Sequence, residues 1–169
     1  MTVNQIGKNL GRSLLKTGIE VLGKSISPTY EVAKSTPIRL LVQEYFPEAK
    51  VIFFDKEYRI TTPEYWNEMD SEIYSITKKQ WKTDVYDCDD KAYTHKYWTL
   101  RIFGMTQFTV YGKTYNLDGT YRNHHLWNAR MTAGKLFFYE PDGNHLIEIK
   151  KGEKAIIGKR IYVPISFEF

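Results

Sequence analysis

The chain has 169 residues, 42% of them hydrophobic and 15% aromatic, and this apolar content predicts one globular domain with a substantial core. The 24 basic and 20 acidic residues are mixed along the chain, so the charge indicates no specific nucleic-acid partner. The sequence has no apolar stretch of about 18 residues and no secretory signal pattern. We therefore expect no transmembrane segment and a reducing, cytoplasmic environment.

Residues 1–27 predict a basic amphipathic arm, and residues 28–169 a single domain. Apolar residues recur in the arm at helical spacing, but each of its glycines weakens a helix by about 1 kcal/mol relative to alanine. Two interpretations stay open. The arm is either a docked or frayed terminus, or a segment that contacts a partner or a membrane surface.

The next elements are read in chain order. Pro28, Pro37 and Pro47 interrupt long helices, and residues 50–54 predict a buried strand. A helix is expected from Thr61 and Thr62 to about residue 80, and another begins at the cysteine. Short runs rich in strand-forming residues then predict a sheet, at residues 99–103, 107–111, 125–131, 135–139, 145–149 and 160–167. Helices followed by strands predict an α+β fold.

The lone cysteine, Cys88, is a candidate nucleophile. Asp87 is a suitable N-cap for a helix whose first turn contains Cys88, and the positive end of a helix stabilises a thiolate. Asp89 and Asp90 place negative charge beside the sulfur, so activation requires a nearby imidazolium. The alternative is a buried structural cysteine behind three aspartates that only cap the helix.

Three motifs raise the case for a thiol site. Cys88 is followed four residues later by Ala92, His125 precedes Leu126-Trp127, and Glu140 precedes a proline. Their order and spacing resemble the transglutaminase-like and papain-like cysteine peptidase superfamily over residues 80–142. Glu140, where that superfamily commonly has aspartate, is similar to the Cys-His-Glu peptidase domain of some fungal agglutinins.

The resemblance implies a papain-like or transglutaminase-like α+β fold, with N-terminal helices and the cysteine packed on an antiparallel sheet. It also implies a cysteine-dependent peptidase or amidase that acts on a peptide or protein substrate. Cys88 would attack a carbonyl, His125 would act as the base, and Glu140 would orient the histidine. Gln80 is the candidate oxyanion donor beside the Cys88 backbone. No cofactor is implied, although calcium dependence is compatible with the resemblance.

The turn at residues 132–135 decides which histidine faces Glu140. A two- or four-residue loop pairs Met131 with Leu136 and places His125 on the face of Glu140. A three-residue loop would shift the register by one and select His124 instead. The match to His-x-Trp favours His125.

Other functions stay open. The aspartates at 87, 89 and 90, with His95 or His124, offer metal ligands but lack the spacing of a calcium loop. Thirteen tyrosines and scattered lysines offer stacking and phosphate contacts, although core and strand positions explain them more simply. Lys91 stands where the related motif usually has an apolar residue. A degenerate domain that serves in structure, viral assembly or binding is therefore the alternative function.

Overall fold

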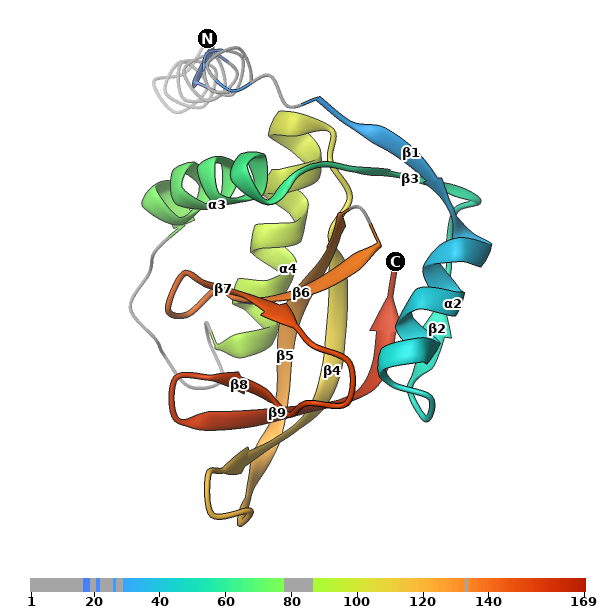
Figure 1. Ribbon diagram of the computed structural model, residues 1–169. Coiled ribbons are helices and arrows are strands. Elements are labelled where there is room, and N and C mark those ends of the chain that lie inside the picture. The colour runs from blue at the N-terminus through green and yellow to red at the C-terminus, as the bar shows by residue number, and fades with distance from the viewer. Residues whose placement is uncertain (1–16, 19–20, 22–25, 27–28, 78–86, 133) are drawn as a thin grey trace, which may run out of the picture.

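The computed structural model describes residues 17–18, 21, 26, 29–77, 87–132 and 134–169 (Figure 1). Strands predominate in this part of the chain, where nine of them accompany three helices and one π-helix. The strands are β1 (Glu31–Lys34), β2 (Lys50–Ile52), β3 (Glu57–Ile60), β4 (Phe108–Asn116), β5 (Tyr121–Thr132), β6 (Lys135–Glu140), β7 (His145–Ile149), β8 (Ala155–Ile157) and β9 (Arg160–Glu168). The helices are α2 (Ser35–Tyr45), α3 (Pro63–Thr77), α4 (Cys88–Trp98) and the π-helix η1 (Thr99–Phe103).

One sheet organises the molecule. Its strand order is β2-β9-β4-β5-β6-β7, and β8 also pairs with β9. β2 runs parallel to β9, whereas the other pairs are antiparallel. β1 and β3 form a separate two-stranded ribbon. The long hairpin of β4 and β5 ends in a turn at the bottom of Figure 1, and its outer part stays paired with β9 as far as Asn116.

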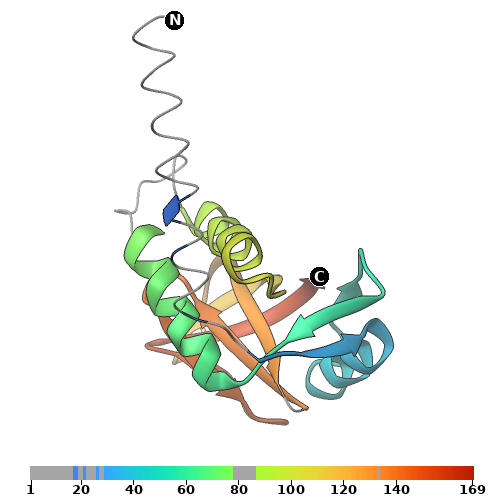
Figure 2. The ribbon, with the colours of Figure 1, turned by 90° about the horizontal axis from the view of Figure 1, so that it is seen from above.

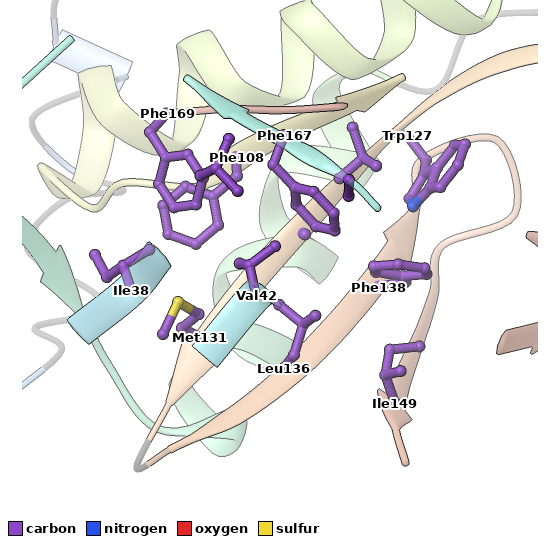
Figure 3. Close-up of a cluster of buried hydrophobic side chains, with 14 of the residues drawn as sticks. Ile38, Val42, Phe108, Trp127, Met131, Leu136, Phe138, Ile149, Phe167 and Phe169 are labelled. Atoms are coloured by element: carbon purple, nitrogen blue, oxygen red, sulfur yellow. The ribbon is translucent and has the colours of Figure 1, made fainter. Parts of the chain in front are cut away.

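Helix α2 covers one face of the sheet. Its fully buried side chains, Ile38 and Val42, belong to a single apolar cluster with residues of β4, β5, β6 and β9 (Figure 3). Phe46, just after the helix, stacks on Phe138 of β6 with ring centroids 5.6 Å apart. Each aliphatic or aromatic side chain buried in this way contributes roughly 1.5–3 kcal/mol, so this cluster is the main core.

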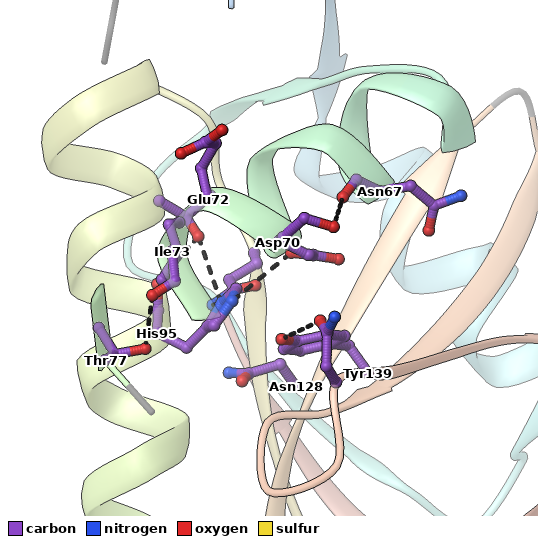
Figure 4. Close-up of polar contacts among 12 residues, drawn as sticks. Asn67, Asp70, Glu72, Ile73, Thr77, His95, Asn128 and Tyr139 are labelled. Atoms are coloured by element: carbon purple, nitrogen blue, oxygen red, sulfur yellow. Dashed lines mark hydrogen bonds and ion pairs between the residues drawn. The ribbon is translucent and has the colours of Figure 1, made fainter. Parts of the chain in front are cut away.

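A buried polar network joins α3 and α4 to the sheet. Arg130 of β5 is fully buried, forms an ion pair with Asp70 of α3 and donates to Gln107 Oε1 at 2.7 Å. Its guanidinium also lies over the Tyr139 ring, 4.1 Å from the centroid. The Gln107 Nε2 amide donates to His95 Nδ1 of α4 at 3.0 Å. Figure 4 shows Asp70 and His95 meeting beside Tyr139 and Asn128.

Most of the predicted strands and both predicted helices are confirmed, with their boundaries shifted by a few residues. Residues 99–103 are the exception, because they continue α4 as the π-helix η1 instead of forming a strand. Pro37 also does not prevent a helix. It stands in the first turn of α2, where the missing N–H of proline has no intrahelical partner to lose.

The expected helix-rich α+β arrangement, papain-like or transglutaminase-like with helices first, is wrong. Residues 31–34 and 57–60, where no strand was expected, form the β1–β3 ribbon, and residues 50–52 form the one strand that was expected in the first half. Tyr58 and Ile60 are buried at alternate positions of β3. Nearby prolines and charged residues obscured this strand pattern in the sequence. The described chain is mostly β-sheet with short helices.

The predicted arm at residues 1–27 lies almost wholly outside the described residues, so the division from residues 28–169 stays a prediction. Among the described residues, no helix is long and apolar enough to cross a membrane.

Gly112 of β4 allows a close approach of three strands. A Cβ added there would lie 2.6 Å from the Trp127 ring and 2.3 Å from the Val163 carbonyl oxygen. Trp127 is itself fully buried in the main core. Only hydrogen fits at this position, since neither the β9 backbone nor the packed indole can move without disturbing the core.

We therefore expect Gly112→Ala to lower the free energy of unfolding by about 1–3 kcal/mol, the usual effect of overpacking. Thermal and urea denaturation would measure the loss. The matched control is Gly119→Ala, at a glycine of the β4–β5 turn where a Cβ would meet no atom within 4 Å but φ is +87°. A loss for Gly112→Ala no larger than for the control would contradict the steric explanation.

Candidate functional site

His125 and Glu140 form a buried pair at the centre of the candidate site. The imidazole Nε2 lies 2.6 Å from Glu140 Oε2, and only 4% and 6% of the two residues are exposed. His125 comes from β5, and Glu140 from the end of the neighbouring β6. The ring packs against Trp127 and Tyr162, with centroids 6.0 and 5.7 Å away, so its orientation is fixed by packing as well as by the carboxylate.

The Glu140 carboxylate is held from several sides. The Tyr162 hydroxyl donates to Oε2 at 2.8 Å, and the Asp142 backbone N–H donates to Oε1 at 3.1 Å. Burial and the nearby Glu140 charge raise the pKa of Tyr162 well above its ordinary value, so the phenol stays a donor. The Asp142 side chain forms an ion pair with Lys91 of α4. These contacts preorganise the carboxylate before any ligand arrives.

Cys88 is the first residue of α4 and is partly exposed. The preceding N-cap residue, Asp87, is extended, and its backbone N–H donates to Asp90 Oδ2 at 3.4 Å. The thiol interacts with the His125 imidazole. We name Cys88, His125 and Glu140 the thiol cluster. The structure therefore places His125 and Glu140 in contact, with Cys88 near enough to influence the imidazole.

The charge state of His125 reflects these contacts. Burial alone would lower its pKa, but hydrogen bonding to Cys88 and Glu140, with their charges, outweighs burial and raises the pKa of His125 to about 9. The imidazole is therefore largely protonated at neutral pH.

The predicted hairpin register is confirmed, because Met131 pairs with Leu136 and Thr132 with Lys135. His125 consequently faces Glu140, whereas His124 is exposed and points to the other face of β5. Gln80, the candidate oxyanion donor, lies outside the described residues.

Among the described residues, one group could hold a metal ion. Ligand atoms of Asp87, Cys88 and Asp89 lie within 4.8 Å of one another. Hydrogen bonding between the two aspartates raises the pKa of Asp87 and lowers that of Asp89, as expected for a pair that shares a proton. His95 is buried beside Asp70 and Arg130 and is not part of this group. The third carboxylate of the metal hypothesis, Asp90, instead caps the helix.

A second feature lies on the outer hairpin. Tyr111 stacks on His124 at 5.4 Å with ring planes 9° apart, and Tyr121 meets His124 edge-on at 5.9 Å. Tyr115 in turn contacts Tyr121 at 5.8 Å. The Tyr121 hydroxyl lies 3.2 Å from His124 Nδ1. We name these four residues the aromatic ladder. The tyrosines were expected at core and strand positions. The alternation of side chains along residues 111–115 was the signal in the sequence that Tyr111 and Tyr115 share one face of a strand.

Three comparisons with known proteins bear on this geometry. No protein-family model matches the chain, and no curated protein matches it. Several solved structures share its fold. Two of them are a complex of PSL1a with E64, at 15% identity and a TM-score of 0.59, and Polyporus squamosus lectin bound to the human-type influenza-binding epitope Neu5Acα2-6Galβ1-4GlcNAc, at 13% and 0.57.

Each comparison covers 82% of this chain but only 51% and 49% of the respective neighbour. The chain therefore spans about half the length of the solved structures that it resembles. At this identity the likeness establishes the fold alone.

The comparisons correct the expectations drawn from the three motifs. Lectin structures share the fold and no peptidase family matches, so membership of the transglutaminase-like and papain-like superfamily is not supported. The cysteine-dependent hydrolase is likewise contradicted, because the solved structures that share the fold are lectin structures. The motifs misled because a cysteine, a histidine and a carboxylate at fixed spacing describe a geometry, and geometry alone does not establish turnover.

The raised pKa of His125 gives a test of the cluster. We expect the imidazole to titrate near pH 9 in the wild type and substantially lower in Glu140→Gln, because the amide keeps a polar contact but loses the charge. The pair's contribution to stability is complete below the unfolded pKa of about 6.5 and disappears as pH rises through 9. NMR titration of the His125 ring protons would measure the pKa of the imidazole in the wild type and in Glu140→Gln.

Glu148→Gln is the matched control for this titration, since Glu148 forms an exposed ion pair with Lys135. An equal fall of the His125 pKa in both variants, or no fall in either, would contradict the assignment of Glu140 as the controlling charge.

Proposed function

We propose that this chain is a carbohydrate-binding module and that the aromatic ladder is its contact surface. The observation that carries the proposal is the row of rings on the outer hairpin, where Tyr121 is 53% and Tyr111 37% exposed. Large aromatic side chains that face solvent in a contiguous row are characteristic of a binding surface rather than of a core.

Sugars suit such a surface for a physical reason. The C–H bonds on one face of a pyranose carry partial positive charge, and an aromatic face is negative, so the two stack. The ladder lies on a paired hairpin with a fixed register, which keeps the rings in place and limits the entropy lost on binding. Lys113, paired with His124 across the strands, supplies a cation for an acidic sugar.

The fold likeness supports the same class of ligand, since one neighbour is a lectin bound to a sialylated trisaccharide. Binding of a peptide or protein by this chain has no comparable support. Binding of single-stranded nucleic acid, which also stacks on aromatic rings, is the competing outcome that an experiment must separate.

We expect a glycan array that contains Neu5Acα2-6Galβ1-4GlcNAc to show binding by the wild type. Tyr121→Ala and Tyr111→Ala should each weaken it about tenfold or more, equivalent to ~1.4 kcal/mol. The matched control is Tyr97→Ala on α4, a residue that is also 57% exposed but lies outside the ladder. Binding of an oligonucleotide with no bound glycan, or equal losses in all three variants, would contradict the proposal.

We propose a second role for Cys88, His125 and Glu140, as a reactive thiol site within the binding module. The contact of 2.6 Å between His125 and Glu140 supports it, together with the interaction of the thiol with a protonated imidazole. A partly exposed cysteine in these surroundings is accessible to electrophiles, whereas a buried structural cysteine is not.

Iodoacetamide should label native Cys88 rapidly at pH 7, and His125→Ala should slow the labelling about tenfold or more, because the thiolate loses its counter-charge. His124→Ala is the matched control and should leave the rate unchanged. Equal slow labelling in all three proteins would assign Cys88 a structural role. Hydrolysis of a peptide or amide that is lost in Cys88→Ala would instead contradict the binding function.

A further inference from the structure

A cavity of about 280 Å³ lies on another part of the molecule. Its walls come from the segment before β3, from α4 and η1, from the loop that follows them, and from Phe169. The apolar part of the lining is Phe54, Tyr58, Leu100, Met105 and Phe169. None of these residues belongs to the thiol cluster or to the aromatic ladder, so the cavity is an independent feature.

Two side chains of opposite charge, Lys96 and Asp55, line this cavity. Lys96 is half-buried on α4, and its Nζ donates to the Glu168 backbone oxygen at 3.3 Å. Asp55 is exposed, and its backbone N–H donates to the Tyr58 hydroxyl at 2.8 Å. In the described part of the chain, neither side chain forms an ion pair with a residue within 4.0 Å.

The position of Lys96 is costly without a counter-charge. Burial lowers its pKa, and the charge of the Glu168 carboxylate, which lies beyond ion-pair distance, opposes that shift. An ammonium with one neutral acceptor retains donors that can bind a carboxylate. The opposite charge of Asp55 offers an acceptor for an ammonium group on the same occupant.

We propose that this cavity binds a small zwitterion with an apolar group, that is, a free α-amino acid such as phenylalanine or leucine. Its carboxylate binds Lys96, its ammonium binds Asp55, and its side chain contacts the exposed apolar residues of the lining, Phe54 and Leu100. A single charge would meet one attractive and one repulsive wall, whereas a zwitterion satisfies both. The cavity is near the lower limit of volumes known for ligand pockets, which fits an occupant of this size.

Helix geometry supports a binding role for this region. Leu100 lies in η1, the π-helix that follows Lys96 by one turn, and π-helical turns interrupt α-helices frequently at functional sites. Here the wider turn places Leu100 at the cavity with 57% of its surface exposed. An exposed leucine beside an apolar cavity contributes surface that an apolar ligand would cover.

Calorimetry and NMR with L-phenylalanine test the proposal. The wild type should show saturable binding, with 3-phenylpropionate and phenethylamine at least tenfold weaker because each lacks one charge. Lys96→Met and Asp55→Asn should each weaken L-phenylalanine at least tenfold. The matched controls, Lys154→Met and Glu57→Gln, replace exposed charges outside the cavity and should change nothing.

Thr106→Phe, which fills the cavity from its wall, should abolish binding and supplies a second variant if Lys96→Met lowers stability. Absence of saturable binding to the wild type would overturn the proposal. Equal affinity for L-phenylalanine and 3-phenylpropionate, or unchanged affinity in Lys96→Met, would overturn it as well. Glycan binding through the aromatic ladder is unaffected by any of these results, so the two proposals fail separately.

Discussion

The buried guanidinium of Arg130 is the constraint on which the remaining architecture depends. A charge removed from water is stable only when its donors and its charge are satisfied locally, and here Asp70 supplies the counter-charge and Gln107 an acceptor. Desolvation by burial raises the pKa of Asp70 to about 7, and the Arg130 charge opposes that shift. Because Asp70 belongs to α3 and Arg130 to β5, satisfying this charge requires the helix to dock on the sheet.

Docking of α4 follows from the same network and positions the thiol. His95 joins the network through Gln107, and Asn128 of β5 donates to the Ala92 carbonyl at 3.1 Å. Both contacts fix the axis of α4 against β5. Cys88 begins that helix, so its distance from His125 is set by polar contacts one to two turns away rather than by the cysteine itself.

Part of this arrangement could be predicted from local sequence. The turn at residues 132–135 restricts the pairing of β5 with β6 to few registers, and the motif around His125 selected the right one. The helix at Cys88 was signalled by an aspartate before it and acidic residues in its first turn. These features depend on neighbours in the chain, which is why pattern reasoning could identify them.

Other features depend on partners distant in the sequence and were missed. Gln107 and Arg130 look like surface residues until Asp70, 60 positions from the arginine, neutralises the charge. The stretch at 99–103 has strand-forming residues, but it continues α4, and the Thr99 hydroxyl donates to the His95 carbonyl one turn earlier. The resemblance carried by three motifs suggested a function because it matched residue types, whereas the fold likeness concerns the backbone path over 82% of the chain.

The neighbouring histidines of β5 have a consequence for divergence. His125 faces the buried carboxylate and His124 stacks in the aromatic row on the opposite face. Substitutions on one face can accumulate while the other is preserved, since alternate residues do not share neighbours. Insertion or deletion of one residue upstream in the strand would exchange both histidines at once. Related chains should therefore conserve the length of β5 even where the residue types on one of its faces change.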